Sequence, residues 1–347
     1  MQVLSISALK GGVGKTTMTL GLASAAMQRG LRTLVIDLDP QCNTSNGLGA
    51  VGDFDVTAAE VIKKPRHNTV SEAILVSSWA KGQTGKLDVM VGHSRLTAAN
   101  GTNPSFKKLW NLEQALAKVE PSYDLVLIDT PPSINALTRM AWVASDRVLL
   151  VTEPTFNSVI AVESATKALT ELRKQVNRNV TLMGVVINRL RTTVAEHQFR
   201  INELEELYSS LLVDVVFEEK SVIAQAQGAG RAIHSFPGQA AAKIAAQFDS
   251  LLEKVQKSFA SEDIRRIEMT GRSSKNRYSK RSHDGSKRSG RRSTEAPQVN
   301  IGERVELVDT SPVSDEYKDK FSEALRQTMT SKQIKAIKEG ELPEEKN

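Results

Sequence analysis

Short apolar runs alternate with longer helical patterns over the first 260 residues of the chain. The apolar runs are strand-like and nearly continuous, at 3–9, 31–38, 87–91, 123–128, 147–152, 180–187 and 213–217. Apolar residues recur at helical spacing between them, at 18–27, 107–119, 158–176, 195–211, 220–229 and 238–258. Residues 57–80 are expected to form short helices. Strands that are apolar throughout are typical of parallel sheets covered on both faces. The alternation predicts an α/β fold with a doubly wound, mostly parallel sheet and helices on both faces.

The pattern changes after residue 260. Residues 265–292 hold 11 Lys and Arg against two Asp and Glu, with few large apolar side chains. Such a composition buries too little apolar surface to offset the entropy of ordering, so we expect a basic, disordered linker over 261–314. Phe321, Leu325 and Met329 then share one helical stripe, which predicts a short terminal helical segment at 315–340.

Charge and cysteine content narrow the class of protein. The formal net charge of +6 comes from the basic stretch, because residues 1–264 carry 27 Lys and Arg against 26 Asp and Glu. Cys42 is the only cysteine, which excludes an internal disulfide or a cluster held by several cysteines of one chain. The first apolar run is too short for a signal peptide, and no run reaches the about 18 residues of a spanning helix. We therefore expect a cytoplasmic protein.

A glycine-rich sequence joins the first strand pattern to the first helical pattern. It reads Lys10-Gly11-Gly12-Val13-Gly14-Lys15-Thr16-Thr17. Strand, glycine loop, Lys-Thr and helix form the context of a P-loop, in which backbone N–H groups and a helix N-terminus bind phosphates. We expect Lys15 to reach the β- and γ-phosphates of a nucleotide and Thr16 to supply an oxygen to Mg²⁺.

Acidic and amide side chains end three of the other predicted strands. Asp129 follows an apolar run, in the position of a carboxylate that holds Mg²⁺. Asp39 ends the strand pattern at 31–38 and is suited to orienting an attacking water, while Asp37, two residues earlier, is expected to join the surroundings of the Mg²⁺. Asn188 ends a later strand, where its amide can either read a purine edge or stabilise a turn.

Three motifs together resemble a known family. They are the loop from Lys10 to Thr17, the segment Asp37-Leu38-Asp39-Pro40-Gln41, and the segment Leu127-Ile128-Asp129-Thr130-Pro131-Pro132-Ser133. They look like the deviant-Walker ATPases of the ParA/MinD group, over about residues 1–257, and most like the ParA branch. Phe217-Glu218 stands where ParA proteins commonly carry Ile-Pro, so the usual packing of a proline on adenine is missing.

The resemblance implies a mechanism and its cofactors, ATP and Mg²⁺. Two subunits would close face to face around two nucleotides as a homodimer, and Lys10 would reach across to the phosphates of the partner. Asp39 would orient the attacking water and touch the metal through water, and Asn188 would lie at the adenine-reading position. The segments that sense the γ-phosphate would be Asn43 and Thr44, and Thr130, Pro131 and Pro132.

The resemblance also implies non-specific DNA binding by arginines in the matching region, Arg189, Arg191, Arg200 and Arg231. Ordinary solvated arginines are an equally good interpretation of each one singly. The basic stretch after residue 265 is open to two interpretations as well, a salt-sensitive contact to nucleic acid or a soluble linker.

The function that follows is an ATP-dependent dimerising switch on the nucleoid. It would position or segregate a chromosome, plasmid or division cargo, and a ParB-like partner would stimulate its slow ATP hydrolysis. The alternative is a MinD-like, membrane-associated regulator of division-site placement, but the terminal segment is a poor membrane anchor. A nitrogenase-reductase type is excluded by the single cysteine, and the intact Lys15, Thr16, Asp39 and Asp129 argue against a scaffold that does not hydrolyse ATP.

Overall fold

The computed structural model describes residues 1–81, 85–99, 101, 105–176, 180–209 and 211–278 of the chain. All of them belong to one compact unit, Met1–Arg281. Its centre is an eight-stranded sheet in the order β3-β4-β2-β5-β1-β6-β7-β8. The strands are β1 (Gln2–Ser7), β2 (Thr33–Asp37), β3 (Ile74–Val76), β4 (Leu87–Met90), β5 (Leu125–Asp129), β6 (Arg147–Thr152), β7 (Thr181–Leu190) and β8 (Leu212–Glu218).

Seven of these strands are parallel, which confirms the predicted doubly wound sheet. β1 lies between β5 and β6. The chain first builds β2, β3 and β4 on one side of β1, returns to insert β5 beside β1, and then continues with β6, β7 and β8 on the other side. Ligands bind at the carboxyl ends of strands where the winding reverses in sheets of this kind. The loop that begins after β1 occupies that position.

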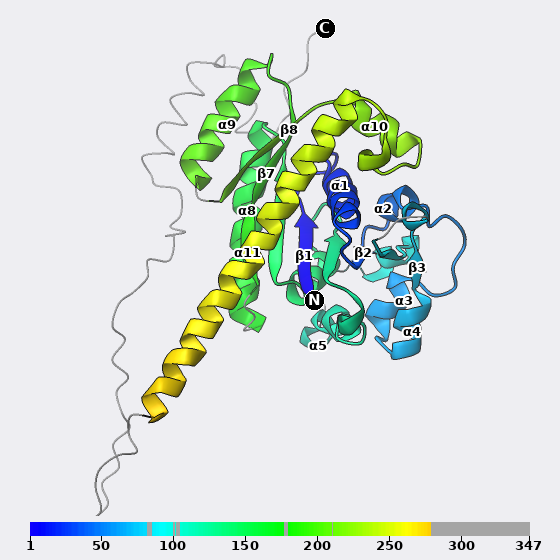
Figure 1. Ribbon diagram of the computed structural model, residues 1–347, viewed down its shortest axis with the longest axis vertical. Coiled ribbons are helices and arrows are strands. Elements are labelled where there is room, and N and C mark those ends of the chain that lie inside the picture. The colour runs from blue at the N-terminus through cyan, green and yellow to red at the C-terminus, as the bar shows by residue number, and fades with distance from the viewer. Residues whose placement is uncertain (82–84, 100, 102–104, 177–179, 210, 279–347) are drawn as a thin grey trace, which may run out of the picture. The chain divides into compact units, whose positions relative to one another are not determined.

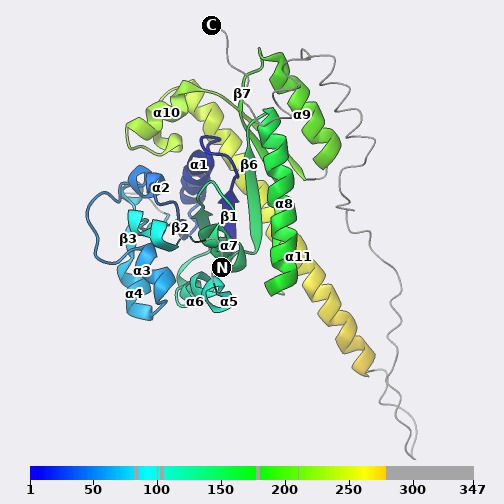
Figure 2. The same ribbon diagram turned by 180° about the vertical axis from the view of Figure 1, so that it is seen from behind.

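Helices cover both faces of the sheet, as the two opposite views show (Figure 1 and Figure 2). α1, α10 and α11 pack on one face, and α3, α6, α7 and α8 pack on the other. The helices are α1 (Lys15–Gln28), α2 (Asn43–Gly47), α3 (Ala58–Lys63), α4 (His67–Glu72), α5 (Phe106–Leu109), α6 (Asn111–Leu116), α7 (Ala136–Ala144), α8 (Phe156–Val176), α9 (Ala195–Tyr208), α10 (Ser221–Gly228) and α11 (Gln239–Tyr278).

Successive side chains of the central strands enter different cores. Leu125 and Leu127 of β5 face α1 and α11, whereas Val126 and Ile128 face the helices on the other side. All four are buried. Because both faces of the strand are buried, every position is apolar, and the strand runs are therefore continuous in the sequence.

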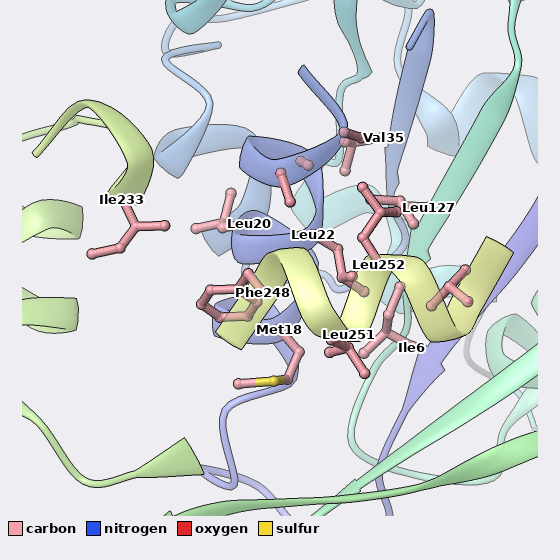
Figure 3. Packing of buried hydrophobic residues seen from close by; sticks show 14 of the residues in the cluster. Ile6, Met18, Leu20, Leu22, Val35, Leu127, Ile233, Phe248, Leu251 and Leu252 are labelled. Carbon is pink, nitrogen blue, oxygen red and sulfur yellow. The ribbon is translucent and has the colours of Figure 1, made fainter. Parts of the chain in front are cut away.

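α11 packs closely across α1 (Figure 3). Phe248, Leu251 and Leu252 of α11 meet the surface of α1, and Gly21 lies at the contact. A Cβ built on Gly21 would lie 2.1 Å from the ring of Phe248. The absence of a side chain at Gly21 therefore leaves room for the ring of Phe248, although glycine lowers the intrinsic stability of α1.

One expectation was wrong. Residues 57–80 contain not only short helices but also β3, an antiparallel edge strand paired with β4. Three residues are too few to show a period of two, so the pattern gave no sign of it. The last helix, α11, continues past residue 260 to Tyr278. The rest of the expected linker and the terminal helical segment at 315–340 lie outside the described residues.

The contact at Gly21 makes a prediction about stability. An alanine normally stabilises a helix by about 1 kcal/mol relative to glycine. In Gly21→Ala the added methyl meets the ring of Phe248, so we expect the free energy of unfolding to fall by roughly 1–3 kcal/mol in urea denaturation.

A matched control is Gly228→Ala in α10, where an added Cβ has open space. That variant should be as stable as the unsubstituted protein or more stable. Combining Gly21→Ala with Phe248→Leu should restore part of the loss. A Gly21→Ala protein that is more stable than the starting chain would contradict the close packing of α1 on α11.

Candidate nucleotide-binding site

The glycine loop connects the end of β1 to the first residue of α1 in a left-handed path. Gly12 and Gly14 have φ values of 79° and 94°, which disfavour residues with a Cβ. A Cβ on Gly14 would also lie 2.1 Å from Nδ2 of Asn188. The backbone thus curls at the N-terminus of a 14-residue helix, a geometry that binds anions.

The two lysines of the loop have different environments. Lys15 is the first residue of α1 and is only 7% exposed. The side chain of Lys10 is 38% exposed, and its Nζ forms an ion pair with Glu153 at the end of β6. Oγ1 of Thr155 lies 3.5 Å from the same Nζ. Lys10 therefore sits at the rim of the site, while Lys15 lies inside it.

Asp129, the last residue of β5, lies beside the start of α1. Its Oδ2 accepts hydrogen bonds from Oγ1 of Thr16, at 2.8 Å, and from Oγ1 of Thr44. Its Oδ1 is buried without a hydrogen-bond partner. Burial raises the pKa of Asp129, while the positive charge of Lys15 opposes that shift. A carboxylate oxygen with no partner next to a threonine hydroxyl fits a Mg²⁺ ion or its bound water.

Asp37 serves as an anchor for the neighbouring loop. Its carboxylate accepts hydrogen bonds from N and Oγ of Ser45, at 2.8 and 2.7 Å, and from N of Asp39 at 3.1 Å. Burial raises the pKa of Asp37 to about 7, and the nearby charge of Asp129 adds to the shift. The bonds to Ser45 hold the start of α2 against β2.

Asp39 lies in the loop beyond β2, which ends at Asp37, and not on the strand itself. It is buried, and its Oδ1 accepts a hydrogen bond from N of Gln41 at 3.0 Å. The turn explains the difference from the strand pattern, because the carboxylate of Asp37 captures N of Asp39 and draws the backbone out of the extended conformation.

Both expected sensing segments adjoin Asp129, one through a hydrogen bond and the other along the chain. Thr44 touches Asp129 directly, while the side chain of Asn43 bonds Gln41 at 3.2 Å and faces solvent. Thr130 donates its hydroxyl to O of Ile6 in β1 at 3.0 Å. Pro131 and Pro132 follow it and lead toward α7.

The end of β7 meets the glycine loop from another side. Nδ2 of Asn188 donates to O of Val13, and Nη1 of Arg189 donates to O of Gly12, both at 2.7 Å. Asn188 is buried against the loop. Arg189 was expected on a DNA-binding surface, so its contact with the loop is a feature that sequence reasoning missed.

The other three candidate arginines do not gather around the loop. Arg191 forms an ion pair with Glu219 at 2.5 Å. Arg200 bonds Glu196 and Glu203 and lies over the rings of Phe156 and Phe199. Arg231 is exposed and bonds O of Ser235 at 2.8 Å.

Sequence reasoning also missed Glu153, Glu219 and Gln227. Gln227 of α10 donates its Nε2 to Oγ1 of Thr17 at 3.2 Å and so joins α10 to the loop. Glu153 and Glu219 each follow a strand directly, and this position at a strand end is the signal in the sequence that could have found them.

Among the described residues, no group of three or more His, Cys, Asp and Glu is placed to hold a metal ion without other ligands. A Mg²⁺ ion that is bound with a nucleotide needs only one or two carboxylates, because phosphates and waters complete its shell. In the same part of the chain, every helix is too short or too polar to cross a bilayer.

Known proteins show the same organisation. Residues 1–182 match the model of a family described as an AAA domain. The chromosome partitioning protein ParA of Caulobacter vibrioides is 32% identical over 192 residues, 54% of this chain and 69% of ParA. The sporulation initiation inhibitor protein Soj of Bacillus subtilis is 26% identical over 233 residues, 67% of this chain and 90% of Soj.

A solved structure extends the comparison to the fold. A Cyanothece McdA–ATP complex superimposes with a TM-score of 0.64 at 20% identity, over 74% of this chain and 96% of that one. The family model, the ParA relative and the loop with its flanking acids point to the same group. The chain belongs to the AAA domain family and, within it, to the ParA/MinD group of P-loop ATPases.

Proposed function

We propose that this protein is an ATP-driven positioning switch. It binds ATP with Mg²⁺ at the loop from Lys10 to Thr17, pairs with a second copy, and releases its cargo after hydrolysis. The different environments of the two loop lysines carry this proposal. A P-loop needs one lysine inside the site, and Lys15 supplies it. Glu153 holds Lys10 at the rim of the site. In a pair of subunits, the phosphates bound by the second copy could replace Glu153 as the partner of Lys10.

The residues around Asp129 fit a Mg²⁺ ion bound with the nucleotide. Thr16 would supply a hydroxyl oxygen, and the unpartnered Oδ1 of Asp129 would contact the ion or its water. Bound Mg²⁺ would neutralise charge on the phosphates. Thr44 bonds the same carboxylate, so it would connect the state of the site to α2.

Asp39 is proposed to orient the water that attacks the terminal phosphate. Its carboxylate is buried, and N of Gln41 fixes its direction. A buried, oriented carboxylate can hold a water for in-line attack through a hydrogen bond. Lys10 from a partner would add positive charge where negative charge develops, which would make hydrolysis depend on pairing.

The cargo and the partners are inferred from relatives. The names of ParA and Soj refer to chromosome partitioning and sporulation, which supports a role in positioning. We infer non-specific binding to nucleoid DNA and an activating ParB-like protein. Because Arg189, Arg191 and Arg200 are paired with acidic groups, the DNA contact is assigned mainly to the basic stretch at 265–292 and to Arg231.

The first prediction distinguishes the role of Lys10 in pairing from the role of Lys15 in nucleotide binding. With Mg²⁺ and a non-hydrolysable ATP analogue, the unsubstituted protein should shift from monomer to dimer in size-exclusion chromatography with light scattering. Lys10→Ala should bind the analogue but stay monomeric. Lys15→Ala should lose roughly 10- to 100-fold in affinity, as expected for a lost hydrogen bond to a charged group.

Lys220→Ala is the control for removing a lysine, since Lys220 pairs with Glu218 at 2.7 Å and not with the loop. It should dimerise normally. If Lys10→Ala dimerises as the unsubstituted protein does, Lys10 has no role in pairing.

The second prediction concerns the buried charge at Asp129. In Asp129→Asn the ligand-free protein should gain roughly 1–2 kcal/mol of stability near pH 8, because a buried carboxylate is replaced by a neutral amide. Thermal denaturation should also show that Mg²⁺ no longer increases the stabilisation by the ATP analogue. Asp124→Asn, an exposed change at the other end of the same strand, should leave the Mg²⁺ effect intact. An undiminished Mg²⁺ effect in Asp129→Asn would remove this residue from the metal site.

The third prediction concerns DNA. Asp39→Ala is expected to bind ATP without hydrolysing it, so it provides a stable ATP state. With ATP it should bind plasmid duplex at 50 mM salt, and its affinity should fall by about 10³-fold or more at 200 mM if six or more phosphates are contacted. A variant should show a weaker salt dependence of DNA affinity when serine replaces six basic residues, Lys280, Arg281, Lys287, Arg288, Arg291 and Arg292. No binding at 50 mM salt would disprove the DNA proposal.

A further inference from the structure

The end of β7 has an irregular backbone next to the glycine loop. Ile187 pairs with Val216 of β8 and Leu190 pairs with Glu218, so β7 contains one residue more than β8 over this stretch. The extra residue forms a bulge, and Arg189 within it has a φ of 56°. Bulges of this kind redirect a side chain and are frequent beside active sites. An arginine with left-handed backbone is uncommon and points to a constraint from its surroundings.

The bulge brings two consecutive side chains onto one loop. Neighbouring residues of a regular strand point to opposite faces, so they cannot both contact the same segment. Here Asn188 bonds O of Val13 and Arg189 bonds O of Gly12, each at 2.7 Å. The two acceptors are themselves consecutive carbonyls of the glycine loop.

These two bonds set the direction of two N–H groups. A trans peptide is planar, and its C=O and N–H point to opposite sides. O of Gly12 shares a peptide with N of Val13, and O of Val13 shares one with N of Gly14. When β7 holds both carbonyls on its own side, both N–H groups turn away from β7. Successive N–H groups that converge in this way form the anion-binding concavity of a P-loop.

Glu219, just after β8, holds Arg189 in place. Its Oε1 lies 3.4 Å from Nε of Arg189, and its Oε2 lies 2.5 Å from Nε of Arg191. The hydrogen bond and charge of Arg191, together with the charge of Arg189, hold the pKa of Glu219 below its usual value. Glu219 is therefore charged at neutral pH and anchors the guanidinium that reaches the loop.

We propose that Arg189 is a positioning residue of the nucleotide site, which together with Asn188 holds the phosphate-binding backbone of the glycine loop open for its ligand. Arg189 acts through the loop and not on the base of the nucleotide. The inference rests on the proposed binding of ATP at this loop, and it extends that proposal to a residue that was expected on a DNA-binding surface.

The test compares Arg189→Gly, Arg189→Ala and Arg189→Lys in the full-length chain. Binding of ATP, ADP and tripolyphosphate is measured by calorimetry, and folding is checked by thermal denaturation. Glycine accepts the left-handed backbone and removes only the side chain, so this variant should melt at or above the temperature of the unsubstituted protein. Its affinity for all three ligands should still fall by about five- to tenfold. Lysine, which keeps a positive charge, should recover part of the loss.

Two further variants test whether Glu219 anchors the guanidinium of Arg189. Glu219→Gln should reduce affinity in the same direction as Arg189→Gly, because the guanidinium loses its charged partner. Arg191→Ala also removes a partner of Glu219 but does not touch the loop, so nucleotide affinity should stay within twofold.

Tripolyphosphate distinguishes holding the loop from contacting the base, because it has no base. If Arg189→Gly binds all three ligands as tightly as the unsubstituted protein, or loses affinity for ATP but not for tripolyphosphate, the proposal is wrong. If the unsubstituted protein itself binds no ATP, the proposed function fails instead, so the two failures are distinguishable.

Discussion

The burial of α1 on nearly all sides is the constraint on which the site depends. The helix lies between the central strands and α11, and most of its residues from Lys15 to Met27 are buried. A fully buried leucine contributes about 1.5–3 kcal/mol, so α1 cannot shift without losing many such contacts. Because the glycine loop ends where α1 begins, the packing of α11 on α1 also fixes the position of the candidate phosphate-binding loop.

Opposing charges are concentrated at this fixed point. Asp37 and Asp129 are fully buried on adjacent strands, and burial raises the pKa of both. Lys15 partly balances Asp129, but one oxygen of Asp129 has no hydrogen-bond partner. Two buried carboxylates so close together are electrostatically unfavourable for the folded protein, and a bound cation would offset that cost. Hydrogen bonds from Thr44 to Asp129 and from Ser45 to Asp37 join both carboxylates to α2.

Much of this arrangement was predictable from local patterns. The seven parallel strands are continuous apolar runs, and the loop and its flanking acids occur at the ends of such runs. β3 was not predicted because a three-residue edge strand has no measurable period. Asn188 was predicted either to read a purine edge or to stabilise a turn. Its bond to O of Val13 in the glycine loop is a further contact that a position at a strand end does not reveal.

The sequence by itself determined the fold class, the phosphate loop and the acids that surround it, because each depends on residues that are close together in the chain. Tertiary structure decided what those residues touch. Lys10 meets Glu153 across 143 residues, and Arg189 meets Gly12 across 177. The second contact also needs a bulge in β7, which depends on how β7 pairs with β8. No local pattern encodes such a pairing, since the free energy that maintains an unusual backbone comes from contacts that form only when the sheet is complete.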